Sequence, residues 1–419
     1  MKKLFLGTSA LIGAALFTSV ANAEAPKITV GGFSTFEAGW TNSDNDSGEI
    51  NRAFRNDNEI HFNVAGKGDN GLGYGAEIDL QADIDGAGNN VPGSSAPGFT
   101  NSGIVAHRTY GWLQGDNWGH IEFGSNDGVA RTMKVDASSI ARATGGIDGD
   151  FKYFADVNTL AAPGISGGSA GTFGSATAAL NAVTGKANFI TSPRLPVENG
   201  PADGFSSDLW GNDNKITYYT PRFMGFQLGV SYAPELYDRG QATNRPADSG
   251  DGVSGTSDIW EGGLNYEHQF DPVGFAAAVT GETGTVSNDR TAGTHVNGLE
   301  AWNAGAKISC HDFSIAGSYG DWRDSFDVDG VKADYWTVGG AYETGSLGAS
   351  VTYMSSEYRP TGFDDKFQDV SVGVDYKLAP GLTPFAEYTW YDIDPSGTLP
   401  TGTVENKGNV VIVGSELSF

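Results

Sequence analysis

The stretch Tyr74-Gly-Ala-Glu-Ile-Asp-Leu-Gln-Ala-Asp-Ile84 alternates apolar and polar side chains almost without a break. Its even positions are apolar throughout, and its odd positions include Glu77, Asp79 and Asp83. Because a β-strand sends successive side chains to opposite faces, this stretch predicts a strand with one apolar and one acidic face. Burying a row of carboxylates would be very costly, so the acidic face is expected to line water.

The same alternation recurs along the rest of the chain and predicts sixteen strands. Clear examples are residues 226–232 and 370–378, where every even position is apolar. The expected strands span residues 28–40, 57–66, 73–84, 105–115, 119–124, 214–220, 225–233, 258–268, 273–282, 300–309, 312–320, 333–342, 347–355, 367–378, 383–391 and 409–419.

Short and long connections between these strands strictly take turns. The short ones fall at 67–72, 116–118, 221–224, 269–272, 310–311, 343–346 and 379–382, and the longest of the others spans 125–213. A soluble sandwich has no reason to alternate in this way, whereas a barrel across an outer membrane has short periplasmic turns and long outside loops. The sequence therefore predicts an all-β, transmembrane, up-and-down antiparallel barrel of 16 strands.

Aromatic residues mark both ends of the predicted strands, always on the apolar face. At the outer ends lie Trp40, Tyr232, Trp260, Trp302, Tyr319, Trp336, Tyr353 and Trp390, and at the inner ends Phe226, Tyr266, Phe313, Tyr342, Tyr376 and Phe419. Two aromatic belts are typical of a wall that faces lipid. The alternative is a soluble sandwich with these aromatic residues scattered through its core.

Composition narrows the class of protein further. Hydrophobic residues make up 39% of the 419 residues and charged residues only 18%. Past the first two dozen residues, no apolar run approaches the roughly 18 residues of a membrane-spanning helix, which excludes a helical membrane protein. The 51 acidic residues against 25 Lys and Arg make nucleic acid an unexpected partner. Cys310 is the single cysteine, so no intrachain disulfide can form.

The first 23 residues have the features of a secretory signal peptide. Lys2 and Lys3 precede an apolar stretch over residues 4–20, and Ala21-Asn-Ala23 has the small residues of a cleavage site. We expect cleavage after residue 23, which leaves a single barrel domain over residues 24–419.

Three segments resemble Gram-negative porins of the kind found in alphaproteobacteria. They are Arg108-Thr-Tyr-Gly-Trp-Leu-Gln-Gly-Asp-Asn-Trp-Gly-His-Ile-Glu-Phe-Gly124, Asn214-Lys-Ile-Thr-Tyr-Tyr-Thr-Pro-Arg-Phe-Met-Gly-Phe-Gln-Leu-Gly-Val-Ser-Tyr-Ala-Pro234 and the terminal Phe419. The resemblance implies an outer-membrane homotrimer in contact with lipid and lipopolysaccharide, in which each barrel is narrowed by an inward-folded third extracellular loop, here 125–213. It also implies that Phe419 is read by the barrel assembly machinery. A loop of this length departs from the shorter loop usual in the family.

The resemblance also implies a constriction in which loop carboxylates face basic residues of the barrel wall. The loop candidates are Asp136, Asp148 and Asp150, and the wall candidates are Arg52, Arg55 and Arg108. Arg55 shares strand parity with Glu59, whereas the parity at Arg108 is ambiguous because Trp112 and Leu113 compete for the lipid face.

These residues favour a passive channel for small hydrophilic solutes and ions, with no catalytic residues. The acidic lumen wall of Glu59, Glu77, Asp79 and Asp83 predicts a mild cation preference, because rings of acid attract cations. The alternatives are a channel selective for a sugar or nutrient ion, and a barrel that anchors an enzyme or adhesin.

No cofactor is expected, and the six histidines show no metal-binding spacing. The acidic groups Asp44/Asp46/Glu49 and Asp327/Asp329 offer oxygen ligands for Ca²⁺, but neither has the full spacing of a Ca²⁺ loop. The segment Gly66-Lys-Gly-Asp-Asn-Gly71 fits a dinucleotide-binding pattern, but no helix is expected after it.

Overall fold

The computed structural model describes residues 24–44, 51–82, 104–155, 189–199, 212–236, 256–286, 297–325, 329–359, 364–394 and 405–419. The expected signal peptide over residues 1–23 lies outside the described residues, as do Asp46, Asp83 and Asp327 and much of the segment 125–213. Glu49 also lies outside them.

Sixteen strands form a single closed barrel, as the alternation predicted. The strands are β1 (Glu24–Ser43), β2 (Arg52–Lys67), β3 (Gly73–Gln81), β4 (Val105–Gly115), β5 (Gly119–Ser125), β6 (Asn214–Tyr219), β7 (Phe226–Glu235), β8 (Thr256–Phe270), β9 (Val273–Val286), β10 (Leu299–Cys310), β11 (Phe313–Arg323), β12 (Lys332–Thr344), β13 (Leu347–Arg359), β14 (Asp365–Tyr376), β15 (Leu382–Asp394) and β16 (Asn406–Ser418).

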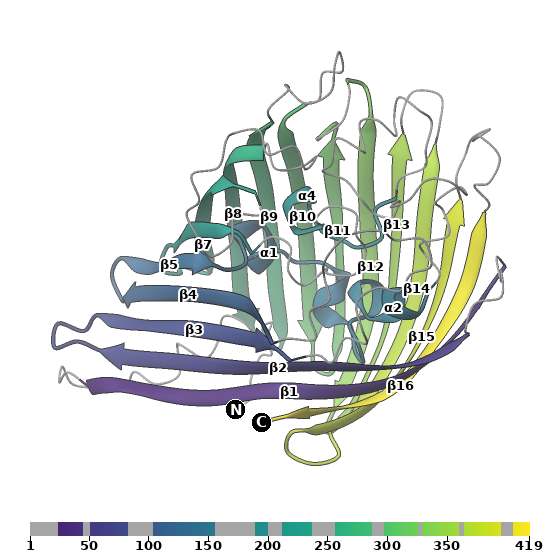
Figure 1. Cartoon of the computed structure of the whole chain (residues 1–419), viewed down its shortest axis with the longest axis horizontal. Coiled ribbons are helices and arrows are strands. Elements are labelled where there is room, and N and C mark those ends of the chain that lie inside the picture. The colour runs from purple at the N-terminus through teal and green to yellow at the C-terminus, as the bar shows by residue number, and fades with distance from the viewer. Residues whose placement is uncertain are drawn as a thin grey trace.

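Every strand pairs antiparallel with its neighbours in chain order, and the first strand pairs with the last. The β1–β16 ladder runs from Phe33 opposite Ser418 to Ser43 opposite Gly408. The first and last strands of the barrel therefore lie side by side (Figure 1). Closure removes every unpaired strand edge, which is the condition for crossing a hydrocarbon layer with strands. Among the described residues, no helix is long and apolar enough to cross a membrane.

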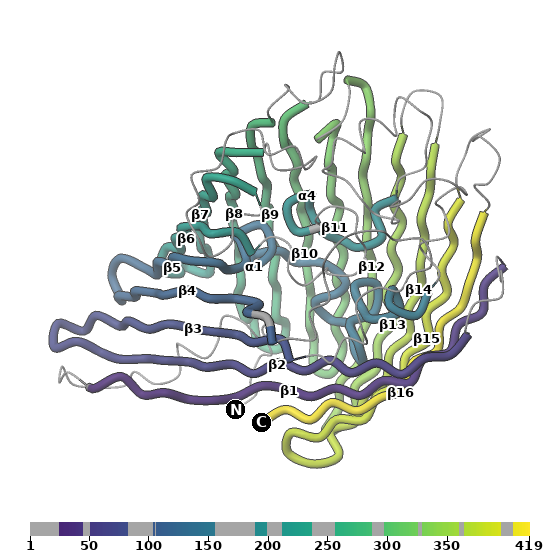
Figure 2. The backbone as a smooth tube through the Cα atoms, in the orientation of Figure 1, coloured from purple at the N-terminus to yellow at the C-terminus, as the bar shows by residue number. Residues whose placement is uncertain are grey.

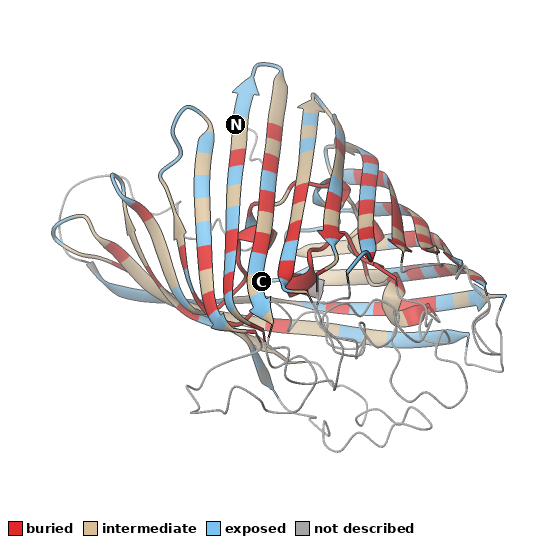
Figure 3. Cartoon of the chain, turned by 90° about the horizontal axis from the view of Figure 1, so that it is seen from above, coloured by how far each residue is buried: buried red, intermediate tan, exposed pale blue. Residues whose placement is uncertain are grey.

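The two faces of the wall differ as predicted. Burial alternates along most strands (Figure 3), and the exposed positions carry large apolar side chains. Trp260 and Phe226 are each 50% exposed, and they lie on the predicted apolar face near opposite ends of the β7–β8 pair. The opposite face carries buried polar residues such as Glu37, Thr217 and Asp369.

Short helices from the segment 125–213 lie inside the barrel (Figures 1 and 2). They are α1 (Val129–Thr132), the 3₁₀ helices η1 (Ala137–Ile140) and η2 (Gly146–Asp148), α2 (Phe151–Phe154) and α4 (Pro196–Asn199). Ile147 and Ile190 pack with the wall residues Trp322, Tyr335 and Met354. Burying a side chain of this size stabilises the packed state by about 1.5–3 kcal/mol.

Backbone N–H groups of this segment donate to side chains of the inner wall. The donor and acceptor residues are Val129 and Ser231, Ala130 and Glu261, Ala137 and Thr337, Arg142 and Ser350, Ile147 and Thr352, and Val197 and Glu282. Buried N–H groups need such partners, because an unmet donor costs about as much as a lost hydrogen bond. The wall therefore supplies the acceptors that the short helices lack.

Candidate functional site

One polar cluster joins the inner segment to β2 through Arg55. Its Nη1 donates to Asp150 Oδ2 at 3.0 Å and to Glu37 Oε2 at 3.2 Å. Its Nη2 donates to Asp57 Oδ2 at 2.8 Å, and the guanidinium lies 3.9 Å from the centre of the Tyr153 ring. The structure therefore brings together Arg55 and Asp150, a wall candidate and a loop candidate from the sequence.

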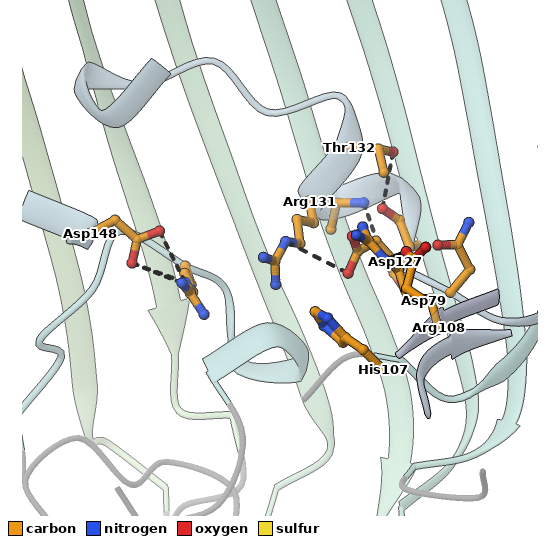
Figure 4. Close-up of polar contacts among 12 residues, drawn as sticks. Asp79, His107, Arg108, Asp127, Arg131, Thr132 and Asp148 are labelled. Atoms are coloured by element: carbon orange, nitrogen blue, oxygen red, sulfur yellow. Dashed lines mark hydrogen bonds and ion pairs between the residues drawn. The ribbon is translucent and has the colours of Figure 1, made fainter. Parts of the chain in front are cut away.

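A second cluster is built around Arg108 on β4 (Figure 4). Arg108 Nε donates to Asp79 Oδ2 at 2.9 Å, and Nη1 donates to Asp127 Oδ2 at 3.1 Å. Arg131 Nε lies 3.6 Å from Asp127 Oδ1. Burial alone would raise the pKa of Asp127, but Arg131 and Arg108 hold the pKa of this carboxyl well below its usual range. Asp127 is therefore a fixed negative charge between two cations.

The ambiguity of parity on β4 is resolved by a bulge in its pairing with β3. The register shifts between Asp79 and Leu80, so Asp79 faces Arg108 while Leu80 faces Ala106. Such a shift re-aims a side chain, and both His107 and Arg108 contact inner-wall carboxylates. Trp112 is buried on the same face as Arg108, and Leu113 has the parity of the lipid face.

The inner segment holds a third cluster around Asp148 (Figure 4). Arg194 Nε and Nη2 lie 3.1 Å and 3.0 Å from Asp148 Oδ1, and Lys152 Nζ also lies 3.0 Å from this oxygen. Burial would raise the pKa of Asp148, but Arg194, Lys152 and Lys134 hold it well below its usual range. Asp148 thus joins two parts of the segment that are 46 residues apart.

Two residues predicted to line the constriction, Asp136 and Arg52, lie in other surroundings. Asp136 is 1% exposed, accepts a hydrogen bond from Ser139 N at the start of η1, and pairs with Lys134 at 2.9 Å. It therefore caps a helix and does not present a carboxylate to water. Arg52 is exposed and has the strand parity of Phe54, which is 76% exposed, so the prediction that Arg52 faces the lumen is wrong.

The remaining predicted wall acids lie on the inner face of β2 and β3. Glu59 is buried beside His107, with 2.6 Å between Oε1 and Nδ1. Asp79 is buried, and Glu77 is half-buried on the same face of β3. Asp83 lies outside the described residues, and the acidic groups considered for Ca²⁺ are described only at Asp44 and Asp329.

Several charged residues of the lumen were not expected from the sequence. Lys215 on β6 pairs with Glu261 on β8 at 3.3 Å, and both are buried. Their odd positions share the parity of the inner face on these strands, so alternation alone could have found them. Arg194 and Lys134 had no such signal, because they lie in the irregular segment inside the barrel.

Taken together, the inner wall and the segment inside it form a polar zone of fixed positive and negative groups. The outer face of the barrel is apolar and carries exposed aromatic residues. A closed barrel of sixteen strands with a polar interior is the architecture of channel-forming proteins of the outer membrane.

Comparison with known proteins gives the family. A family model described as Gram-negative porin matches residues 8–396, and the chain belongs to this family. An uncharacterized protein of Rickettsia bellii is 25% identical over 482 residues, with all of both chains covered. The protein is accordingly an outer-membrane porin.

Solved structures share the fold. The anion-selective porin from Comamonas acidovorans is 15% identical and superposes with a TM-score of 0.59, covering 94% of this chain and 100% of its own. OmpT, an outer membrane protein of Vibrio cholerae solved in a trimer form, is 12% identical with a TM-score of 0.51 and the same coverage. At this identity the likeness concerns the fold alone.

Proposed function

We propose that the chain forms a general channel for passive diffusion of small hydrophilic solutes, with a mild preference for cations. The observation that carries this proposal is the contact between Asp150 of the inner segment and Arg55 of the wall. This contact fixes the inner segment to the wall within the lumen, and the field of such fixed charges orients polar solutes and disfavours apolar ones.

The cation preference rests on the excess of acid around each wall arginine. Three carboxylates, of Asp150, Asp57 and Glu37, surround Arg55. Arg108 faces Asp79 and Asp127, and Glu59 and Glu77 lie on neighbouring positions of the same wall. The local charge is therefore negative, which concentrates cations in a channel with low-dielectric walls.

The reversal potential in a salt gradient tests the preference. In a planar bilayer with unequal KCl on the two sides, we expect a potential of the sign for K⁺ over Cl⁻. Screening over about 8 Å at physiological ionic strength should weaken it as salt is raised. A potential of the opposite sign at low salt would refute the cation preference.

A channel selective for one sugar or nutrient ion is the second candidate. Liposome swelling separates the two, because a general channel admits neutral sugars in order of their size. Rapid uptake of one sugar against exclusion of its isomers would favour the selective channel. We propose that diffusion through the channel needs no catalytic residue and no cofactor, because the fixed charges of the polar zone can orient solutes without either.

Three partners belong to the same proposal. Self-association as a homotrimer is supported by the trimer form of the Vibrio cholerae protein, which shares the fold. Lipid and lipopolysaccharide would contact the apolar outer wall, and the terminal Phe419, 64% exposed, would be read by the barrel assembly machinery. Chemical crosslinking in mild detergent tests the trimer, and a purely monomeric product would contradict it. Binding of Ca²⁺ at carboxylates of the outside loops also remains a prediction. Calorimetric titration with CaCl₂ would test it.

A further inference from the structure

A group of three potential metal ligands lies on the lumen wall, beside Arg108. Glu59 and His61 occupy alternate positions of β2, and Asp79 lies directly opposite His61 on β3. One ligand atom from each of these residues lies within 4.8 Å of the other two. Alternate residues of one strand and the facing residue of its neighbour share a face of the sheet, so the ladder itself holds the three together.

The geometry between Glu59 and His61 is that of two ligands facing a common point. His61 Nε2 lies 3.1 Å from Glu59 Oε2, at ion-pair distance but without the alignment of a regular hydrogen bond. Ligand atoms about 2.0–2.1 Å from one tetrahedral Zn²⁺ lie about 3.3 Å apart, close to the separation found here.

The third ligand, Asp79, has one carboxylate oxygen that accepts a hydrogen bond and one that does not. The Asp79 side chain is 0% exposed, and its Oδ2 accepts from Arg108. Its Oδ1 has no hydrogen-bond partner among the described residues. A buried carboxylate oxygen without a partner carries a large desolvation cost, which a cation would remove.

The surroundings support the same three ligands. His107 Nδ1 lies 2.6 Å from Glu59 Oε1, which orients this carboxylate and leaves Oε2 toward His61. The edge-to-face contact between Phe33 and His61, with ring centres 6.3 Å apart, restrains the imidazole. His61 is 24% exposed, so the position is accessible from the lumen and an open coordination site could hold water.

We propose that Glu59, His61 and Asp79 form a lumen-wall binding site for a divalent transition-metal ion of the Zn²⁺ class. An imidazole nitrogen in the ligand set favours Zn²⁺ and its neighbours over Ca²⁺ and Mg²⁺, which take oxygen ligands. The site does not rest on the proposed diffusion function, since the strand register alone assembles it.

Calorimetric titration of ZnCl₂ into the chelator-treated, detergent-folded full chain tests this site. We expect one site per chain, and at least tenfold weaker binding in His61→Asn and in Glu59→Gln. The matched control is His120→Asn, since His120 Nε2 also lies beside a lumen carboxylate, 2.9 Å from Glu122 Oε1, but outside this group of ligands. It should bind Zn²⁺ as the unaltered chain does.

A slower-migrating band after heating in gel electrophoresis verifies that each variant has folded before titration. Absence of a stoichiometric site in the unaltered chain, or equal loss in His61→Asn and His120→Asn, would overturn the proposal. Conductance of the metal-free protein tests the channel separately. The metal site and the channel can therefore be refuted independently of each other.

Discussion

At the scale of single residues, the proposed cation preference can be tested at the carboxylate of Asp150, which joins the inner segment to Arg55. We predict that Asp150→Asn lowers the ratio of cation to anion permeability by a few-fold at low salt, because Arg55 keeps its charge while one of its partners loses its own. The measurement is the reversal potential in a KCl gradient. Asp116→Asn removes the same charge from an exposed turn and should leave the ratio unchanged. Equal ratios in all three proteins would remove Asp150 from the ion path.

Arg108 is the residue whose loss should cost most stability. Removing it leaves Asp79 buried without its ion pair, and breaking a buried pair costs about 3–5 kcal/mol. We therefore predict that Arg108→Gln lowers the unfolding free energy in urea, measured in detergent micelles, by about 3 kcal/mol. Arg323→Gln is the control, because Arg323 and Glu300 form an exposed pair worth under about 1 kcal/mol. A similar small loss for both variants would contradict this account of the Arg108 cluster.

At the scale of elements, the 3₁₀ helix η2 is held on the wall by one carboxylate. Glu387 on β15 accepts from Thr144 N at 3.2 Å, Thr144 Oγ1 at 2.7 Å and Gly146 N at 3.2 Å. Each hydrogen bond to a charged group contributes about 1.5–3 kcal/mol. We predict that Glu387→Ala loosens this turn and increases the current noise of the open channel.

The control for this prediction is Glu416→Ala, which removes an acidic side chain from β16 that accepts a hydrogen bond from Ser418 Oγ. Its open-channel noise should match that of the unaltered protein. If Glu387→Ala is equally quiet, the contacts of Glu387 do not restrain the segment.

The helix α4 should detach more readily as the pH rises. Burial raises the pKa of Glu198 to about 7, against the opposing effect of Lys134, Arg131 and Arg194. A pKa raised on folding contributes stability that is complete below the ordinary value near 4.5 and is lost as the pH rises through about 7. We predict that proteolysis between residues 189 and 199 accelerates from pH 5.5 to 8.5, and that Glu198→Gln flattens this dependence.

The pKa of Glu198 differs by about 2.5 units between the two states, which corresponds to at most about 3.4 kcal/mol of docking energy. The charge of Glu261 also raises the pKa of Glu198, whereas the three cations lower it. The helix α4 is also held by the hydrogen bond from Val197 N to Glu282. A cleavage rate independent of pH in the unaltered chain would show that Glu198 does not control α4.

The elements were largely predictable from the sequence because alternation is a direct consequence of the two faces of a strand. The expected segment 105–115 coincides with β4, and 73–84 has the right start for β3. Several strands extend beyond the predicted ends, as β13 does from 355 to Arg359, because the hydrogen-bonded ladder continues where the apolar pattern fades.

The site was less predictable for two physical reasons. Alternation says which face a residue takes, which was sufficient for Arg55 and should have excluded Arg52. It says nothing of an irregular segment, so Arg194 as the partner of Asp148 and the capping role of Asp136 could not be read from spacing. Nor does alternation show which inner-wall acids contact the segment inside the barrel, as Glu261 and Glu387 do.

At the scale of the whole molecule, pairing of β1 with β16 closes the strands into one sheet, which has an apolar outer face and a polar inner face. Neighbouring strands satisfy one another's backbone hydrogen-bonding groups within the lipid. The same strands hold the charged clusters in fixed positions. Membership of the porin family and the closed sixteen-strand barrel together indicate that the molecule conducts small solutes and ions.

The most direct measurement is the current across a planar lipid bilayer after addition of the detergent-folded protein, whose folded state is first verified by heat-dependent migration. We predict stepwise increases in conductance of uniform size that persist under moderate voltage. A folded protein that inserts into the bilayer and leaves the current at its baseline would contradict the account of this molecule as an open, water-filled channel.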